Sequence, residues 1–472
     1  MPAKLRFHGA AREVTGSMHL IELNGRSVAL DCGLNQGRRA EANAKNKSFP
    51  RDPAKIDAVI LSHAHIDHCG KLPRLVKEGF SGPVYGTPAT CDLAAVLLDD
   101  SAKIQVEDAE YWNKKRVKRG DDPIEPLYTH EDVEATVRLF RKRDLNMEFE
   151  VIPGLRASLH EAGHMLGSST VSVTIDNGTA GPTRIVYTGD IGRRGLDILR
   201  DPAPLPPCDY LICESTYGGR DTSPPEDMTD EFAEIINDTM QRGGKLIIPA
   251  FAVGRTQVLV YKYHVMLLEG KIPHHYPLIV DSPLALRATE VFKNHPEVFD
   301  REASAFNSLT GDMLRCKHDE YIEDVEQSKA LHKRNEPMVI LSTSGMCEVG
   351  RILHHLKNNV ENYKNTILIV GYQAAHTLGR RIVEKQKQIK IFGEMYDLKA
   401  RVKVLTGFSA HANAAELIEA TQPLVGHVKK VFLIHGEVDQ QDALAARMRE
   451  AGFKDVVIPE ANQSFELNGA NP

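Results

Sequence analysis

The first sixty residues alternate short apolar runs with turn residues. The runs are "LRFHG", "MHLIEL", "SVALDCG" and "DAVILSH", and such segments between turns are typical of β-strands. Helical periodicity follows over residues 89–98 and 130–140. Strand patterns return in "RASLH", "TVSVTI" and "TRIVYTGD". Strands with interleaved helices predict a layered α/β domain.

A stretch with four prolines, "RDPAPLPPCDY" (residues 200–210), predicts a boundary. After it the pattern becomes βα-like, and buried-type strands such as "PLIVDSP" and "PMVILSTSG" end in small polar residues. Parallel sheets usually have this pattern. Strand–turn patterns with histidines return from Arg401. We therefore expect a first domain over residues 1–207, an inserted domain over 208–400, and a C-terminal part of the first domain over 401–472.

The composition is that of an ordinary folded protein, with 472 residues, 42% hydrophobic and 26% charged. No apolar run approaches the about 18 residues of a membrane span, so we expect no membrane association. The seven cysteines are dispersed without a CxxC pair, which favours a reducing compartment, and we expect a cytoplasmic protein. The net charge of −6 gives no support to general nucleic-acid coating, but leaves a local basic groove open.

A dense group of polar side chains follows the predicted strand "DAVIL". It comprises His63, His65, Asp67 and His68 in "LSHAHIDHCG". Imidazole and carboxylate groups are good zinc ligands, and a turn after a strand can direct alternate side chains to one point. We expect His63 and His65 to bind one ion, and Asp67 and His68 to bind a second ion beside it.

A site for two metal ions needs more ligands than this turn holds. Candidates at other predicted strand ends are His164 in "EAGHMLGSS", Asp190 in "YTGD" and His435 in "FLIHGE". Asp190 has two carboxylate oxygens and is the natural bridge between the metals. An isolated histidine, such as His8 or His130, is more often a hydrogen-bonded core or surface residue.

These motifs resemble those of the metallo-β-lactamase superfamily, and more closely its β-CASP nucleases, over essentially the whole chain. "SHAHIDH" resembles the superfamily signature, and "LDCG" resembles the motif whose aspartate, here Asp31, orients the metal-binding loop. "CESTYG" with Glu214, "GFSAH" with His411 and "FLIHGE" with His435 are similar to the β-CASP blocks. One departure is Asn413, where relatives commonly have aspartate.

The resemblance implies a four-layer αββα metallo-β-lactamase domain with an inserted α/β β-CASP domain, whose largely parallel sheet is flanked by helices. It also implies two Zn²⁺ ions, with Mn²⁺ as the alternative metal. A hydroxide bridging the metals would attack phosphorus, and His411, paired with Glu214, would protonate the leaving 3′-oxygen. The implied catalytic residues are His411, Glu214, Asp67 and Asp190, and the products are a 5′-phosphate and a 3′-hydroxyl.

Substrate contacts are predicted at two turns. Arg255 in "FAVGRTQ" stands at a predicted helix start, and Ser342 and Ser344 belong to "STSG". Free backbone N–H groups, a guanidinium and hydroxyls can hold a phosphate, although packing or capping would use the same groups. The basic run "WNKKRVKRG" (residues 112–120) is interpreted as a solvated helix face, with an RNA-contacting edge as the alternative.

Histidine at position 435 resembles the RNA-processing members, since DNA-repair members usually have valine there. We therefore expect a zinc-dependent endoribonuclease that hydrolyses single-stranded RNA, with 5′–3′ exonuclease activity and a homodimer left open. The alternatives are a DNA nuclease of the same architecture, a small-molecule hydrolase, which the large insert disfavours, and a non-catalytic RNA-binding paralogue.

Overall fold

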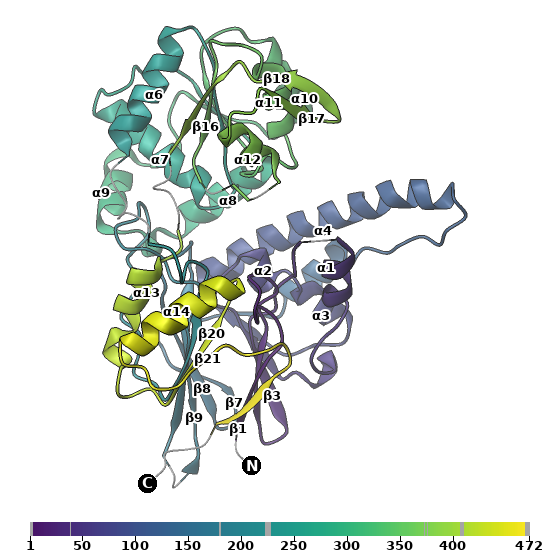
Figure 1. Cartoon of the computed structure of the whole chain (residues 1–472), viewed down its shortest axis with the longest axis vertical. Coiled ribbons are helices and arrows are strands. Elements are labelled where there is room, and N and C mark those ends of the chain that lie inside the picture. The colour runs from purple at the N-terminus through teal and green to yellow at the C-terminus, as the bar shows by residue number, and fades with distance from the viewer. Residues whose placement is uncertain are drawn as a thin grey trace. The chain divides into compact units, whose positions relative to one another are not determined.

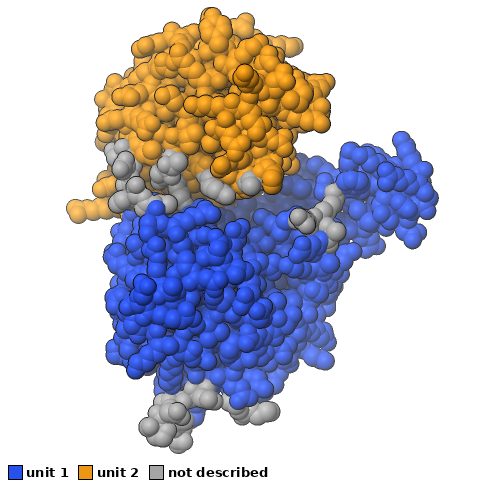
Figure 2. All heavy atoms as spheres, viewed as in Figure 1, with its two compact units in different colours: residues 1–194, 201–222, 411–472 blue, residues 195–200, 223–410 orange. Residues whose placement is uncertain are grey.

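The computed structural model describes residues 3–37, 39–178, 181–221, 228–371, 373–374, 376–405 and 410–467. The chain forms two compact units (Figure 2). Unit 1 contains residues 1–194, 201–222 and 411–472, and unit 2 contains residues 195–200 and 223–410. Unit 2 is therefore inserted between sequence segments of unit 1.

Unit 1 is built on two seven-stranded sheets. The first has the strand order β22 (Ser464–Leu467), β1 (Ala3–Phe7), β2 (His19–Leu23), β3 (Arg26–Leu30), β4 (Ala58–Ile60), β5 (Val84–Gly86), β6 (Phe140–Lys142). The second has the order β21 (Val456–Val457), β20 (Lys430–Ile434), β11 (Tyr210–Glu214), β10 (Thr183–Tyr187), β9 (Ser169–Ile175), β8 (Leu155–Glu161), β7 (Phe149–Ile152). Because β10, β11 and β20 run parallel, their carboxyl ends lie at one edge.

Helices cover the outer faces of both sheets (Figure 1). They are α1 (Arg39–Asn46), α2 (Ile66–Cys69), α3 (Leu72–Lys77), α4 (Pro88–Val117), α5 (His130–Val137), α13 (Ala414–Thr421) and α14 (Val438–Glu450). Apolar side chains of the two sheets, such as Leu30 and Ile212, share one core. The other face of β11 and β20 packs on α13 and α14 through residues such as Leu433 and Leu444. This is the αββα order.

Unit 2 contains a six-stranded sheet in which neighbouring strands pair in parallel. Its order is β14 (Asp319–Tyr321), β13 (Leu278–Asp281), β15 (Val339–Ser342), β12 (Leu246–Pro249), β16 (Thr366–Ile369), β19 (Arg401–Val404). Every residue of β12, β13, β15 and β16 is buried. This burial explains their continuous apolar runs, because helices cover both faces of a parallel sheet.

The remaining elements of unit 2 in the described ranges are seven α-helices, two short 3-10 helices and one hairpin. The helices are α6 (Thr229–Gln241), α7 (Arg255–Leu268), α8 (Pro283–Asn294), α9 (Arg301–Thr310), α10 (Val325–Ala330), α11 (Ile352–Asn359) and α12 (Leu378–Val383). The hairpin pairs β17 (Gln388–Ile391) with β18 (Glu394–Asp397). The αββα unit with its inserted α/β unit confirms the predicted fold class.

The compact units divide the chain at other positions than the expected domains. Strand β11 follows the predicted boundary at residue 207, yet it pairs with β10 and β20 and belongs to unit 1. Strand β19 follows the predicted boundary at residue 400, yet it pairs with β16 and belongs to unit 2. A short apolar run indicates a strand, but it does not indicate which sheet the strand joins.

One predicted helix is shorter than its pattern. Helical periodicity extends over residues 130–140, but α5 ends at Val137 and Phe140–Lys142 forms β6. The three residues of β6 pair in parallel with β5, so sheet pairing overrides the local pattern there. No helix in the described ranges combines the length and the apolar character that crossing a membrane requires.

Candidate metal centre

The predicted metal ligands come together at one edge of the two sheets of unit 1. His63, His65, Asp67 and His68 follow β4, and His164 lies between β8 and β9. The other members follow the parallel strands of the second sheet: Asp190 after β10, Glu214 at the end of β11, and His435 after β20. The carboxyl ends of parallel strands are the usual place for a functional site.

The first cluster comprises His63, His65, His164 and Asp190, whose nitrogen and oxygen atoms lie within 4.8 Å of one another. His65 Nδ1 lies 3.1 Å from His63 Nε2 and 3.2 Å from His164 Nε2. Asp190 Oδ2 lies 3.6 Å from the Nε2 atoms of both His63 and His164. Three imidazole nitrogens and a carboxylate oxygen therefore face one point.

The second cluster comprises Asp67, His68 and His435. His68 Nε2 lies 3.0 Å from His435 Nε2, and Asp67 Oδ2 lies 3.4 Å from the same His435 atom. Asp190 Oδ1 lies 3.5 Å from His68 Nε2 and 3.4 Å from His435 Nδ1. The two oxygens of Asp190 thus face different clusters.

The donor atoms suit two cations. Asp190 is buried, and its Oδ1 has no hydrogen-bond partner within the described chain. A buried carboxylate oxygen without a partner is costly unless a cation binds it. Imidazole nitrogen and carboxylate oxygen form the ligand set that zinc prefers. Both clusters could therefore hold a metal ion.

Asp31 fixes the orientation of the histidine turn. Its carboxylate accepts hydrogen bonds from Ser62 N and Ser62 Oγ, both at 2.7 Å, and from Tyr187 Oη at 2.5 Å. His68 Nδ1 lies 2.7 Å from Asp31 Oδ2. Because a carboxylate only accepts, the proton of a neutral His68 resides on Nδ1 and Nε2 faces the cluster.

Close backbone approach also shapes the site. Gly189, next to Asp190, has φ +56°, and a Cβ there would lie 2.7 Å from Ser62 Cβ. Any larger residue at position 189 would clash with the chain that precedes His63. The glycine of "YTGD" therefore lets the two sheets approach closely enough for Asp190 to reach both clusters.

The protonation of the histidines differs between the clusters. Burial and neighbouring imidazoles hold the pKa of His63 far below its usual value, and burial lowers the pKa of His65 to about 4. Burial opposes protonation of His435 as well, but Asp190 and Asp67 raise its pKa to about 9. Without a cation, protons therefore balance the carboxylates, and metal binding would release them.

Glu214 and His411 form a third group with Asp190. Glu214 is buried and accepts hydrogen bonds from Ile191 N at 2.7 Å and Thr216 N at 3.3 Å. Its Oε2 lies 3.6 Å from His411 Nδ1, and Asp190 Oδ2 lies 3.9 Å from the same nitrogen. Burial disfavours the charged ring, but Glu214 raises the pKa of His411. The Glu214 carboxylate thus accepts hydrogen bonds from backbone N–H groups and also faces the imidazole of His411.

His411 remains partly accessible, with 21% of its side chain exposed. An isolated bridge to Gly192 and a hydrogen bond from Ala412 N to Ile191 O hold its backbone beside Asp190. Residues 406–409, which include "GFS" of the quoted motif "GFSAH", lie outside the described residues.

The predicted substrate residues lie in unit 2. Arg255 begins α7, and its guanidinium donates to the carbonyl of Val370. Ser342 is buried and donates to the Asp281 carbonyl at 2.9 Å, whereas Ser344 Oγ accepts from Glu348 N at 3.2 Å. The contacts of Ser342 are those of a packing residue, and phosphate binding by these three residues stays a prediction.

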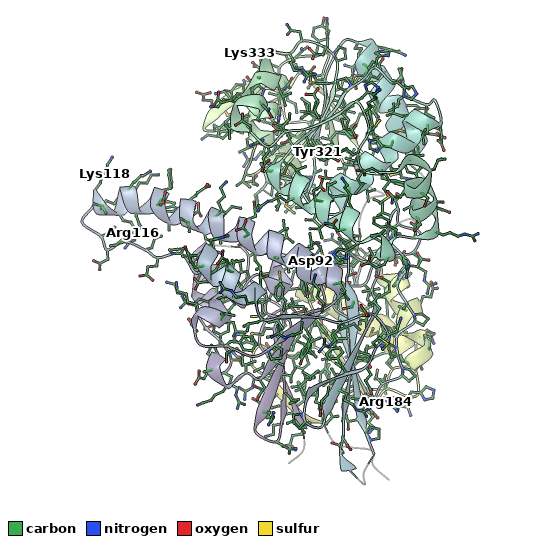
Figure 3. All side chains as sticks on the ribbon, turned by 180° about the vertical axis from the view of Figure 1, so that it is seen from behind. Asp92, Arg116, Lys118, Arg184, Tyr321 and Lys333 are labelled. Carbon is green, nitrogen blue, oxygen red and sulfur yellow. The ribbon has the colours of Figure 1, made fainter. Side chains whose placement is uncertain are left out.

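The basic run over residues 112–120 is the end of the long helix α4. The helix ends at Val117, and Figure 3 labels Arg116 and Lys118 at this end. Lys115 Nζ lies 4.2 Å from the ring centroid of Tyr111 and 5.1 Å from that of Trp112. Most of these residues are exposed, which fits both a solvated face and an RNA-contacting edge, so the choice between the two interpretations stays a prediction.

Sequence reasoning missed the residues that hold the ligands in place. Ser62 and Tyr187 bind Asp31, and Thr216 Oγ1 lies 3.0 Å from His435 Nδ1. Each is a hydroxyl residue within a quoted motif: "SHAHIDH", "YTGD" and "CESTYG". A polar side chain at the end of a buried strand is the signal that indicates them.

Three family models match the chain. The model described as "Metallo-beta-lactamase superfamily" matches residues 11–249, and the "Beta-Casp domain" matches residues 256–382. The "Zn-dependent metallo-hydrolase RNA specificity domain" matches residues 395–459.

The chain is similar to curated proteins over nearly its whole length. It is 38% identical to "Ribonuclease TTHA0252" of Thermus thermophilus, covering 92% of this chain and 94% of that one. It is 32% identical to "Transcription termination factor FttA" of Methanocaldococcus jannaschii, covering 97% and 70%. A crystal structure of a protein of unknown function from Enterococcus faecalis V583 has the same fold, with a TM-score of 0.55, 13% identity, and coverage of 99% and 100%.

An αββα unit with clustered histidines and aspartates at the strand ends defines the class of metallo-hydrolases. With these matches, the chain belongs to the metallo-β-lactamase superfamily and, within it, to the β-CASP branch. The resemblance seen in the sequence motifs is confirmed.

Proposed function

We propose that the protein is a metal-dependent ribonuclease that hydrolyses phosphodiester bonds of single-stranded RNA. The carrying observation is the partly exposed His411, which stands with Glu214 beside two clusters of metal-ligand atoms. A ribonuclease among the relatives and the match to an RNA specificity domain support RNA as the substrate. Cleavage within the strand is the expected mode, with digestion from a 5′ end as a second mode to test.

We infer that two zinc ions bind, one held by His63, His65 and His164 and the other by Asp67, His68 and His435. Asp190 would contact both through its separate oxygens. When bound, zinc lowers the pKa of a coordinated water and offsets the charge of a phosphate group. Mn²⁺ is the alternative occupant, because ligand type alone does not separate the two metals.

His411 would act as general acid. Glu214 and Asp190 both face its Nδ1, so the carboxylates stabilise the protonated ring and hold its orientation. The ring would give its proton to the leaving 3′-oxygen, leaving a 3′-hydroxyl and a 5′-phosphate. This route does not use the 2′-hydroxyl, so preference for RNA over DNA would come from substrate contacts. Arg255 and Ser344 are the candidates we would test first.

The first experiment replaces the general acid. We expect His411→Ala to retain the zinc content of the wild type and to lose about 10²–10⁴-fold in turnover of single-stranded RNA, because proton donation is lost while the ligands stay. Elemental analysis and single-turnover cleavage of labelled RNA and matched DNA measure both effects. His427→Ala, which alters an exposed histidine of unit 1, is the control and should leave turnover unchanged.

Other outcomes identify the alternatives. Zinc loss in His411→Ala would make this histidine a ligand, through its group with Asp190 and Glu214. RNA left intact by the wild type with both proposed zinc sites of unit 1 occupied would favour a non-catalytic RNA-binding protein. Faster cleavage of matched DNA would favour a DNA nuclease.

We also infer that the protein works in the cytoplasm. All seven cysteines carry free thiols, and six of them are buried. Buried free thiols are typical of proteins in reducing compartments. Whether two chains associate is a separate question, which the mass in solution by light scattering would answer.

A further inference from the structure

A further cluster of residues of metal-ligand type lies in unit 2, outside every motif discussed above. It contains His264 of α7, Cys316 of the turn before β14, and Asp319, the first residue of β14. A ring nitrogen, the sulfur and a carboxylate oxygen lie within 4.8 Å of one another. The three residues come from segments about fifty positions apart, so the fold brings them together.

The hydrogen bonds of His264 leave one ring nitrogen directed at an anion. His264 Nδ1 lies 2.8 Å from the Met313 carbonyl oxygen, which only accepts, so Nδ1 carries a proton. His264 Nε2 lies 2.7 Å from Asp319 Oδ2. In a neutral imidazole, Nε2 has a lone pair, and a lone pair facing a carboxylate needs a positive charge between them. Metal-bound histidines usually donate their other N–H to a carbonyl in this way.

Asp319 has capacity for a further partner. Its side chain is fully buried, and Oδ2 also accepts from Cys316 N at 2.6 Å. Its Oδ1 is buried without a hydrogen-bond partner among the described residues. Leaving a buried carboxylate oxygen unsatisfied costs free energy that a bound cation would remove.

Cys316 differs from the other cysteines of the chain. Six of the seven are buried, and Cys316 is the partly exposed one. A turn with a hydrogen bond from Asp319 N to Cys316 O, at 3.2 Å, holds it close to the carboxylate. Thiolate, imidazole and carboxylate together suit zinc better than magnesium or calcium.

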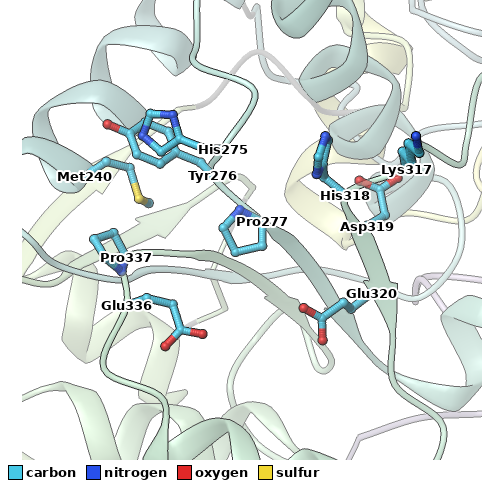
Figure 4. Close-up of a pocket in the computed structure, with 10 residues that line it drawn as sticks. All are labelled: Met240, His275, Tyr276, Pro277, Lys317, His318, Asp319, Glu320, Glu336 and Pro337. Atoms are coloured by element: carbon cyan, nitrogen blue, oxygen red, sulfur yellow. The ribbon is translucent and has the colours of Figure 1, made fainter.

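A cavity reaches this part of unit 2 from solvent. It has a volume of about 620 Å³, and its lining includes Lys317, His318 and Asp319 on one side and His275 and Tyr276 on the other (Figure 4). Asp319 is the one proposed ligand that lines the cavity, and its side chain is fully buried. A zinc ion has four ligands in such sites, so one ligand besides the three side chains, such as a water molecule, would complete the site.

We propose that His264, Cys316 and Asp319 bind one zinc ion, which links α7 to the start of β14. The competing arrangement is a buried imidazolium–carboxylate pair beside an ordinary thiol. The two differ in one chemical respect, because only the zinc site contains a metal–thiolate bond. The proposal concerns unit 2 alone and does not depend on the proposed activity of unit 1.

Cobalt substitution tests this difference in the full-length protein. The ligands proposed for unit 1 are histidines and aspartates, so a thiolate-to-Co²⁺ charge-transfer band would come from the Cys316 site. We expect the cobalt-loaded wild type to show the band. Cys316→Ser should lose the band together with one equivalent of bound metal, and the control Cys347→Ala, at a buried cysteine of the same unit, should keep both.

A second measurement needs no variant. Alkylation of the wild type, mapped by peptide mass spectrometry, should spare Cys316 with zinc bound and label it after chelation. Absence of the thiolate band in the metal-loaded wild type would overturn the proposal. So would persistence of the band in Cys316→Ser, or equal labelling of Cys316 with and without zinc.

Discussion

At the scale of single residues, the candidate centre depends on buried groups that lie outside the two clusters of proposed metal ligands. Asp31 has a left-handed backbone, with φ +59°, and its carboxylate binds Ser62, Tyr187 and His68. One side chain therefore fixes both the turn after β4 and the tautomer of His68. Replacing such an outer partner of a metal ligand typically lowers metal affinity or activity by about 10–100-fold.

Replacing this carboxylate tests the tautomer argument. We expect Asp31→Asn to lower the zinc affinity of unit 1 by about 10–100-fold, because the amide no longer holds the His68 proton on Nδ1. Competition with a chelator of known affinity measures the change. Asp57→Asn is the control, since Asp57 Oδ2 accepts from Ser27 N at 2.8 Å away from the clusters. Equal affinities in the two variants would contradict this role for Asp31.

Asp281 predicts a pH effect on the stability of unit 2. Its buried carboxylate faces His355 Nε2 at 2.6 Å, Arg351 at 2.7 Å and Ser328 Oγ at 2.6 Å. Burial opposes its charge, but these partners lower its pKa below the usual value. The ionised Asp281 therefore contributes its full stabilisation of unit 2 above the pKa of an unfolded aspartate, about 3.9. This stabilisation is lost as the pH falls through the lower pKa of Asp281 in the folded state.

We expect Asp281→Asn to reduce the free energy of unfolding by about 3 kcal/mol at pH 7, because it removes one partner of a buried ionic network. The difference from wild type should shrink below about pH 4. Hydrogen exchange of the β13 and β15 amides measures it at each pH. Asp324→Asn, at an exposed helix cap, should show almost no difference. A difference in unfolding free energy between wild type and Asp281→Asn that grows as the pH falls would contradict the predicted direction.

At the scale of elements, α13 positions the general-acid candidate. Asn413 caps the helix by accepting from Glu416 N at 3.0 Å, and Glu416 Oε2 accepts from Asn413 N at 2.7 Å. Glu416 also accepts from the buried Arg193 Nε at 3.1 Å. Asparagine caps as well as aspartate does, so this departure from the family pattern keeps the capping box two residues after His411.

Breaking the box should disturb His411 without touching a proposed ligand. We expect Glu416→Ala to lower the free energy of unfolding by about 1–3 kcal/mol and to lower RNA turnover, with the zinc content of the wild type retained. Glu419→Ala, at an exposed position of the same helix, should change neither. The pH profile of turnover distinguishes two roles for Glu416. If Glu416 positions His411, the part of the profile that reports the titration of His411 shifts. If Glu416 only stabilises the fold, turnover falls by the same factor at every pH.

At the scale of the whole molecule, the two units have separate cores. The cores of unit 1 lie between its sheets and beneath α13 and α14. The core of unit 2 contains buried side chains of β15, β16, α11 and α12. A ligand that binds one unit therefore stabilises that unit by its own binding free energy.

Zinc should consequently stabilise the units independently. At about 100 times the dissociation constant, binding contributes about 2.7 kcal/mol, and hydrogen exchange of β10, β11 and β20 should slow accordingly. In His63→Ala/His68→Ala this gain should disappear from unit 1, while any zinc-dependent gain in unit 2 stays as in wild type. Equal loss in both units would show that they unfold together.

The sequence predicted most strands and helices of both units, because apolar periodicity and turn residues are local signals. It also predicted that the polar side chains of "HAHIDH" gather at one turn, because they follow a single strand within a few positions. It did not predict that β11 joins unit 1 or that β19 joins unit 2, since pairing between distant strands leaves no local trace. The contacts of Ser62 and Tyr187 with Asp31 also required the fold, because hydroxyl residues are common at strand ends.

The sequence by itself determined the family, the fold class and the types of ligand at each strand end, because these depend on residue identity and spacing along the chain. Only the tertiary structure decided which atoms meet. It placed each oxygen of Asp190 toward a different cluster, set Glu214 and Asp190 on the same nitrogen of His411, and brought His264 to Cys316 and Asp319. Distances between residues far apart in sequence follow from sheet pairing and core packing, and these form only when the chain folds as a whole.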